Sequence, residues 1–212
     1  MSAMVAAERP DVEDAARRAC DRGDYQAATT SALRAYGPEV LGFLRAFLRR
    51  DEDASDVFAV FAEDLWKSLA TFAWECSLRT WAYTLARRAS YRTMKRARRA
   101  SAKNTSDSVL EEVVAKVRTE TLTYLRTEKK TKLRALRESL PEADQMLLVL
   151  RVDRGLAWDE LARVLSEAQT DTDADELRRE AARLRKRFQL VKEKLVARAK
   201  KEGLYSSRDG GD

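Results

Sequence analysis

A strongly basic stretch that also carries aromatic residues lies near the middle of the chain. Between Cys76 and Ser106 the sequence contains nine Lys or Arg residues and no Asp or Glu. Over the whole chain the charges nearly balance, with 41 basic and 35 acidic residues, so this run indicates a surface for a polyanion. Trp and Tyr rings lie among the cations, and such rings can stack on unpaired bases while the cations hold phosphates. The stretch therefore predicts nucleic-acid binding. The alternative is a solvated helix whose tyrosines only complete the core.

The spacing of this stretch is helical. One apolar stripe recurs at intervals of three and four residues and predicts the face that packs on the core. It consists of Leu78, Trp81, Ala82, Leu85 and Ala89. A second stripe, which we expect to face outward, consists of Arg79, Tyr83, Arg87, Ser90, Tyr91 and Met94.

Composition predicts an all-α protein. The 212 residues include only 7 Gly and 3 Pro, and no period-two strand pattern occurs. The length is sufficient for two small domains. There is no His and there are two isolated Cys, which argues against a zinc site and against His-dependent catalysis, so neither metal nor cofactor is expected. The polar N-terminus and the lack of a long apolar run predict a cytoplasmic protein without membrane contact.

Apolar periodicity and composition divide the chain into five parts. Residues 1–30 are predicted to form a loosely held arm, and residues 31–99 a bundle of three helices. Residues 100–131 begin with the polar run ASAKNTSD and are predicted to be a linker that is partly helical. Residues 132–202 form a second helical unit, and residues 203–212 a disordered tail.

The second unit has the outline of a helix-turn-helix. A short helix over residues 157–165 precedes a long helix from Leu177, in which eleven basic residues outnumber three acidic ones up to Glu202. The second helix of such a motif enters the major groove. The long helix also carries a narrow apolar seam, which a coiled-coil strand would show as well. The seam consists of Leu177, Ala181, Leu184, Phe188, Val191 and Leu195. The acidic segment 166–176 is longer than the three or four residues that usually connect the two helices of this motif. Which residues of the long helix face the DNA bases is therefore open by about one helical turn.

The order of these parts resembles the RNA polymerase sigma factors, in particular the small two-domain extracytoplasmic-function class of the sigma-70 family. The resemblance covers about residues 31–202. It implies two small helical bundles, one region 2-like and one helix-turn-helix region 4-like, joined by a polar linker. The residues that carry it are Asp53-Ala54-Ser55-Asp56-Val57, Leu65-Trp66, Phe72, Arg79-Thr80-Trp81-Ala82-Tyr83-Thr84-Leu85-Ala86-Arg87, Leu140-Pro141-Glu142, Gly155-Leu156-Ala157-Trp158-Asp159-Glu160-Leu161-Ala162 and Leu184-Arg185-Lys186-Arg187-Phe188.

The resemblance also implies partners and roles. Core RNA polymerase, through the clamp helices of its largest subunit, would be bound by Asp53, Asp56, Val57, Val60, Glu63 and Asp64. The minus-ten promoter strand would be opened and held by Trp74, Arg79, Tyr83, Arg87, Arg88, Tyr91, Lys95 and Arg96. The minus-thirty-five element would be read by Arg183, Arg185, Lys186, Arg187, Gln189 and Lys192. An anti-sigma factor or another regulator is a further candidate partner. The family usually has Gln followed by an acid where Ala59 and Val60 stand here.

Two other functions compete with a sigma factor. A stand-alone helix-turn-helix regulator would need the basic terminal helix but neither the acidic docking helix nor the aromatic residues of the first unit. An enzyme is disfavoured, because the sequence has no His, no metal-ligand cluster, no Gly-rich phosphate loop and no nucleophile signature.

Overall fold

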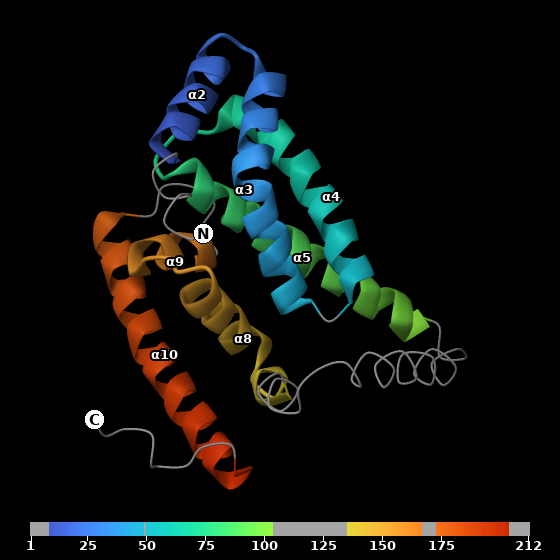
Figure 1. The fold of residues 1–212 in the computed structure, drawn as a ribbon, viewed down its shortest axis with the longest axis vertical. Helices are drawn as coiled ribbons and strands as arrows, with labels where there is room; N and C mark the ends of the chain where they lie inside the picture. The colour runs from blue at the N-terminus through green and yellow to red at the C-terminus, as the bar shows by residue number, and fades with distance from the viewer. Residues whose placement is uncertain (1–8, 49, 104–134, 167–172, 204–212) are drawn as a thin grey trace.

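The computed structural model describes residues 9–48, 50–103, 135–166 and 173–203. The described residues form helices and connecting turns and contain no strand, which confirms the all-α class (Figure 1). The α-helices are α2 (Arg9–Asp21), α3 (Tyr25–Phe47), α4 (Asp51–Ser68), α5 (Leu78–Lys103), α8 (Glu142–Leu148), α9 (Trp158–Leu165) and α10 (Ala174–Lys201). A 3-10 turn, η1 (Leu69–Thr71), follows α4, and a π-helical turn, η2 (Val149–Asp153), follows α8.

The first bundle consists of α2 to α5. Asp24 begins α3 by accepting a hydrogen bond from the Ala27 amide at 3.0 Å. Phe43 and Leu44 of α3, Phe61 of α4 and Leu78 of α5 are fully buried in one core or nearly so. The apolar periodicity of the sequence accounts for these buried faces, because each stripe lies on the side of its helix that meets the other helices. The predicted arm is partly structured, since α2 packs against α3 with Ala16 and Ala19 buried.

The second bundle consists of α8, η2, α9 and α10. Gly155 has a φ of +67°, the left-handed conformation in which a glycine ends a helix without strain. Leu161 and Val164 of α9 pack with Leu177 and Leu184 of α10, as the predicted seam requires. The result is a short helix followed by a long basic one, with α10 running along the outside of the unit (Figure 1).

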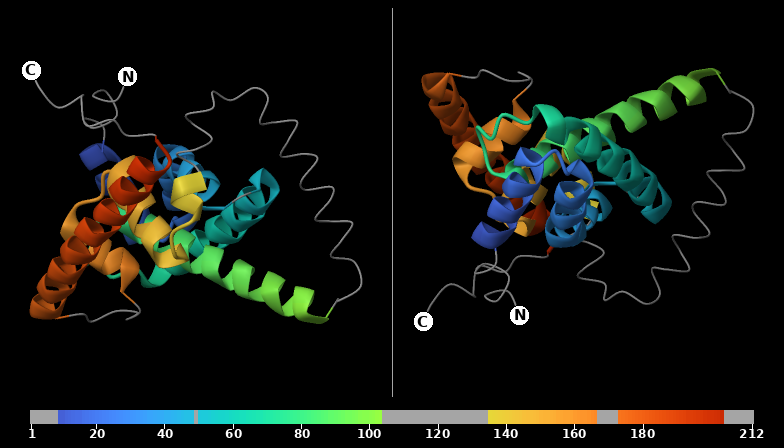
Figure 2. Two further views of the ribbon diagram at one scale, coloured as in Figure 1. Left: turned by 90° about the horizontal axis from the view of Figure 1, so that it is seen from below. Right: turned by 90° about the horizontal axis from the view of Figure 1, so that it is seen from above.

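The two bundles lie against each other and share one hydrophobic core. The same cluster of buried side chains extends from Ala16 and Phe43 to Leu156 and Leu184. Helix α5 lies at the junction, because it contacts α3 and α4 on one side and α9 on the other. Beyond this junction the C-terminal half of α5 projects from the two bundles (Figure 2), although its Arg92 binds Asp64 of α4 and its Arg98 binds Glu142 of α8.

Three predicted segments fall outside the described residues. They are most of the linker together with the first three residues of the second unit (residues 104–134), part of the acidic segment (residues 167–172) and nearly all of the tail (residues 204–212). Within the described ranges, no helix is both long enough and apolar enough to cross a lipid bilayer.

Candidate nucleic-acid interface

Helix α5 carries the basic stretch, and its predicted inner stripe is buried. Leu78, Ala82, Leu85 and Ala89 are enclosed. Trp81 is half-buried, and its indole nitrogen donates to Ser68 Oγ at 3.1 Å, which ties α5 to the end of α4.

The second stripe of α5 does not face outward as its spacing had indicated. Tyr83 and Ser90 are fully buried, and the Arg79 side chain is only 11% exposed. The physical reason is that α3 covers Tyr83, which packs on Phe43 and binds Glu39. The second bundle covers the rest of this side, because Arg79 donates to the Arg154 carbonyl and Arg87 to the end of α9. Helical periodicity within α5 cannot distinguish a stripe that meets solvent from one that meets a second bundle.

Arg79 is the centre of a buried polar cluster. Its guanidinium binds Glu39 of α3, with Nε and Nη2 at 3.0 and 2.9 Å from Oε2, and Nη2 also donates to the Arg154 carbonyl at 2.9 Å. Burial by itself would lower the pKa of Arg79, but the Tyr83 hydroxyl and the Glu39 carboxylate outweigh it and raise that pKa. The Tyr83 hydroxyl donates to the same Glu39 oxygen at 3.2 Å. Burial, and then Glu39, raise the pKa of Tyr83, so the phenol is neutral in the physiological range.

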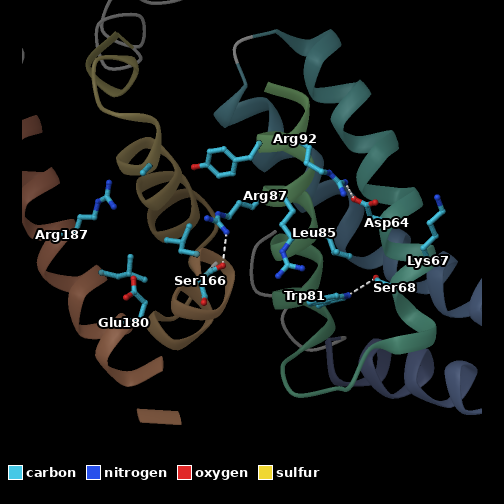
Figure 3. A pocket seen from close by; sticks show the side chains of 15 residues that line it. Asp64, Lys67, Ser68, Trp81, Leu85, Arg87, Arg92, Ser166, Glu180 and Arg187 are labelled. Atoms are coloured by element: carbon cyan, nitrogen blue, oxygen red, sulfur yellow. Dashed lines mark hydrogen bonds and ion pairs between the residues drawn. The ribbon is translucent and has the colours of Figure 1, made fainter. Parts of the chain in front are cut away.

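Contacts between α5 and the second bundle hold the two units together. Glu160 of α9 accepts a hydrogen bond from Thr80 Oγ1 at 3.2 Å and lies 3.9 Å from Arg79. Arg87 Nη1 donates to the carbonyls of Val164 and Ser166, each at 3.2 Å (the second is drawn in Figure 3). These carbonyls lie at the C-terminal end of α9, where the helix dipole favours a cation. Arg87 is therefore engaged within the chain.

The remaining predicted minus-ten residues differ in exposure. Trp74 is half-buried, with its ring 4.9 Å from Phe72. Tyr91 is half-buried between Phe47, at 6.3 Å, and the Arg87 guanidinium, at 5.3 Å. Arg88 lies over the Trp81 ring at 5.7 Å. Lys95 and Arg96 are exposed on the projecting half of α5.

A cavity of about 950 Å³ is lined by α4 and α5 on one side and by α8, the end of α9 and α10 on the other (Figure 3). Its lining includes the cations Lys67, Arg87, Arg88, Arg92 and Arg187, with Asp64 and Glu180 as the acidic residues. Burial, followed by the like charges of Arg87 and Arg92, lowers the pKa of Arg88. Burial is the larger cause of this lowering, and the two like charges add to it.

The predicted minus-thirty-five residues are all exposed on α10 but do not share one face. At 3.6 residues per turn, Arg185, Gln189 and Lys192 lie on one flank, and Arg183 and Arg187 on the other. Lys186 lies between the two flanks, opposite the seam. Arg187 also binds the buried carboxylate of Asp144 at 2.6 Å, which fixes it against α8.

The predicted polymerase-binding residues are on α4, where three are exposed. Asp53, Asp56 and Glu63 face solvent, whereas Val57 is fully buried. Val60 and Asp64 are partly buried, and Asp64 is bound by Arg92 of α5. The predicted set omits Trp66, although its side chain is the most notable apolar feature of this surface, at 54% exposure. Its position three residues after Glu63 could have indicated that the two share a face.

Residues 32–100 match the family model of sigma-70 region 2. The match begins within α3 and ends within α5, so it coincides with the unit that carries the basic aromatic helix. The match supports the assignment of this chain to the sigma-70 family, whose members are transcription factors and not enzymes. It likewise supports a role in promoter recognition and transcription initiation, with core RNA polymerase and promoter DNA as the implied partners. A search of curated proteins gave no significant match.

Proposed function

We propose that the chain is a sigma factor of the extracytoplasmic-function class, which binds core RNA polymerase, directs it to promoters and helps to open the DNA. The observation that carries this proposal is the coincidence of the sigma-70 region 2 match with α3, α4 and α5. In this range an acidic helix with an exposed Trp lies beside a basic helix with partly exposed aromatic rings.

Core polymerase would dock on the outer face of α4. Asp56, Glu63 and Trp66 are exposed there and recur at helical spacing. A large exposed ring rimmed by carboxylates is typical of a protein interface, since aromatic residues contribute most of the binding energy in such patches. Val57 would support this face from the core and would not touch the polymerase.

The opened minus-ten strand would lie along α5 and the loop that precedes it. Trp74 and Tyr91 would stack on unpaired bases, while Arg88, Lys95 and Arg96 hold phosphates. Extrusion of a base costs a few kcal/mol, and stacking on an aromatic side chain contributes about 1–3 kcal/mol per base in return. Tyr83 is a core residue in this arrangement and has no ring face available for a base.

Helix α10 would read the minus-thirty-five element in the major groove. Arg185, Gln189 and Lys192 form a continuous flank with side chains suited to base edges. Lys186, next to this flank, suits a phosphate contact. Arg187 would anchor the helix to α8 through Asp144.

Contact of Arg79 and Arg87 with the minus-ten strand, which the sequence predicted, would require that α9 leave α5. In the described arrangement Arg79 and Arg87 are occupied by Arg154, Glu160 and the end of α9. Gly42 of α3 is part of this contact, because a Cβ there would lie 3.0 Å from Arg154 Nη2. The arrangement thus corresponds to a closed form of the chain.

A reconstitution experiment tests the proposal. The chain is mixed with core polymerase and a pool of random-sequence duplex DNA, retained fragments are recovered, and run-off transcription is measured on them. A sigma factor should be retained by core polymerase and should start transcripts at defined sites. A stand-alone regulator would bind DNA equally well without polymerase and start none, and that outcome would refute the proposal.

A further inference from the structure

Helix α2 lies outside the segment that matches sigma-70 region 2, yet it contacts the part of the first bundle from which α5 begins. The match starts at residue 32, and α2 ends at Asp21. Ala16 and Ala19 bury one side of α2 against the core, and a second side is directed towards the loop at residues 72–77 through Glu13 and Arg17. The sequence had indicated a loosely held arm with at most one short helix here.

Glu13 caps the N-terminus of α5. Its Oε2 accepts a hydrogen bond from the Leu78 amide at 2.7 Å, and its Oε1 accepts one from the Arg79 amide at 3.2 Å. The Tyr36 hydroxyl donates to the same Oε1 at 2.9 Å and orients the carboxylate. Ser77 Oγ accepts from the Thr80 amide at 3.0 Å, so three amides of the first turn have partners. The negative charge of Glu13 also suits the positive end of the helix dipole.

Arg17, one turn after Glu13 on α2, contacts the ring of Trp74 in the loop that precedes α5. Its guanidinium lies 5.6 Å from the centroid of the Trp74 ring, within the range of a cation–π contact. Trp74 has a φ of +59° and is the one non-glycine residue with a positive φ in the described ranges. This conformation is unfavourable for a bulky side chain and persists only where its surroundings enforce it.

The loop is continuous with the aromatic residues of α5. The Trp74 ring packs on Phe72, and Phe72 stacks on Trp81 at 5.3 Å. Glu13 fixes the end of the loop, at Leu78, and Arg17 fixes its middle, at Trp74. Two residues of one helix, four positions apart, therefore determine where the Trp74 ring lies relative to α5.

We propose that Glu13 and Arg17 are positioning residues for promoter opening: they hold the Trp74 loop and the first turn of α5 in the geometry that captures an extruded base. This inference rests on the proposed sigma-factor function. Its physical basis is that a stacking partner stabilises an unpaired base only if the ring is fixed beforehand. Without α2, the strained backbone at Trp74 is free to relax to an ordinary conformation.

The test uses the full-length chain with core polymerase and a duplex fragment selected from random DNA for retention by the wild-type complex. Closed-complex affinity is measured by fluorescence anisotropy at low temperature, and opening by permanganate reactivity of unpaired thymines. Glu13→Ala and Arg17→Ala should each reduce the ratio of open to closed complex about fivefold, the scale of one lost helix cap, while closed-complex affinity stays within about twofold. Arg17→Lys should restore most of the loss, because the ammonium group can also lie over the ring.

Two controls separate positioning from a general loss of structure. Asp14→Asn and Arg18→Ala remove charges from exposed positions of the same helix and should open DNA as the wild type does. A copy of the fragment with a mismatched, pre-opened minus-ten region should restore complex formation by Glu13→Ala, since misfolded protein would fail on both templates.

The outcomes are distinguishable. If wild-type protein opens the duplex and both alanine variants open it with an unchanged ratio, the positioning role is refuted and the sigma-factor proposal stands. If closed and open complexes fall in parallel on both templates, α2 is only structural and the inference is also refuted. If the wild-type complex opens no selected fragment, the underlying proposal fails.

Discussion

Replacement of Tyr83 tests whether this residue is part of the core or of the DNA-binding surface. The ring is fully buried and meets Phe43 edge-on with centroids 5.7 Å apart. Truncation of a buried aromatic side chain to Ala costs about 3–5 kcal/mol, because apolar contacts are lost and a cavity remains. Tyr83→Ala should therefore lower the free energy of unfolding by about that amount. At about 2–4 °C per kcal/mol for a chain of this size, the Tm should fall by about 6–20 °C.

Tyr83→Phe separates the ring from its hydroxyl. Only the hydrogen bond to Glu39 is lost, and Glu39 keeps Arg79 as a partner, so about 1–2 kcal/mol should be lost. Tyr91→Ala is the comparison, since that ring is half-buried and its loss should cost less than that of Tyr83. The free energies are measured by urea denaturation followed by circular dichroism.

The assignment of Tyr83 to the core is wrong if the free energy of unfolding of Tyr83→Ala is within about 1 kcal/mol of the wild-type value, because removal of a fully buried ring costs more than that. It also fails if Tyr83→Phe opens promoter DNA normally while Tyr83→Ala keeps normal stability and loses opening. That pair of results would mean that the ring reaches a base.

Three further predictions concern closure, DNA contact and titration. Thr80→Val removes the hydrogen bond from α5 to Glu160 and leaves Glu160 bound to the Ala157 amide at the start of α9, so amide exchange in α9 should become several-fold faster while exchange in α4 is unchanged; equal rates in α9 would argue against the closed form. Lys186→Ala should reduce the slope of log affinity against log salt for promoter binding by about 0.9, the value of one phosphate contact, without changing the Tm; an unchanged slope would place the DNA elsewhere on α10. Burial raises the pKa of the Cys76 thiol against the opposing effect of Arg163, so in a Cys20→Ser background the folded chain should react with a disulfide reagent more slowly than the unfolded chain at pH 8. At a pH between the pKa of Cys76 in the unfolded chain and its raised pKa in the folded chain, the native state binds more protons than the unfolded state. The free energy of unfolding should therefore decrease as the pH rises through this range. Equal reaction rates for the folded and unfolded chains would contradict the burial of this thiol.

Local patterns predicted the helices and their core-facing stripes because both depend on short-range spacing. The buried faces of α3 and α4 and the seam of α10 on Leu184 follow from apolar residues three or four positions apart. The helix stop at Gly155 follows from the left-handed conformation that a glycine adopts without strain. The basic character of α5 and its aromatic residues are likewise visible in the sequence, and so is the acidic start of α4.

Contacts between distant segments could not be predicted in this way. The outward stripe assigned to Arg79 and Tyr83 is covered by α3 and by the second bundle, and nothing within α5 indicates these neighbours. The cap of α5 comes from Glu13, which is 65 residues away in the sequence from the amide that it binds. The left-handed Trp74 is a similar case, because its conformation depends on packing with Arg17 and Phe72 and not on its own preference.

The hydrophobic core shared by the two bundles has a thermodynamic consequence. Separation of α9 from α5 would bring buried side chains such as Leu156 and Leu161 closer to water, and exposed apolar surface raises the heat capacity. If the two bundles separate when the protein binds promoter DNA, the heat-capacity change of binding should be less negative than the value expected from the protein–DNA interface area alone. A calorimetric titration at several temperatures would detect the parting of the two bundles as this deficit, independently of any distance measurement.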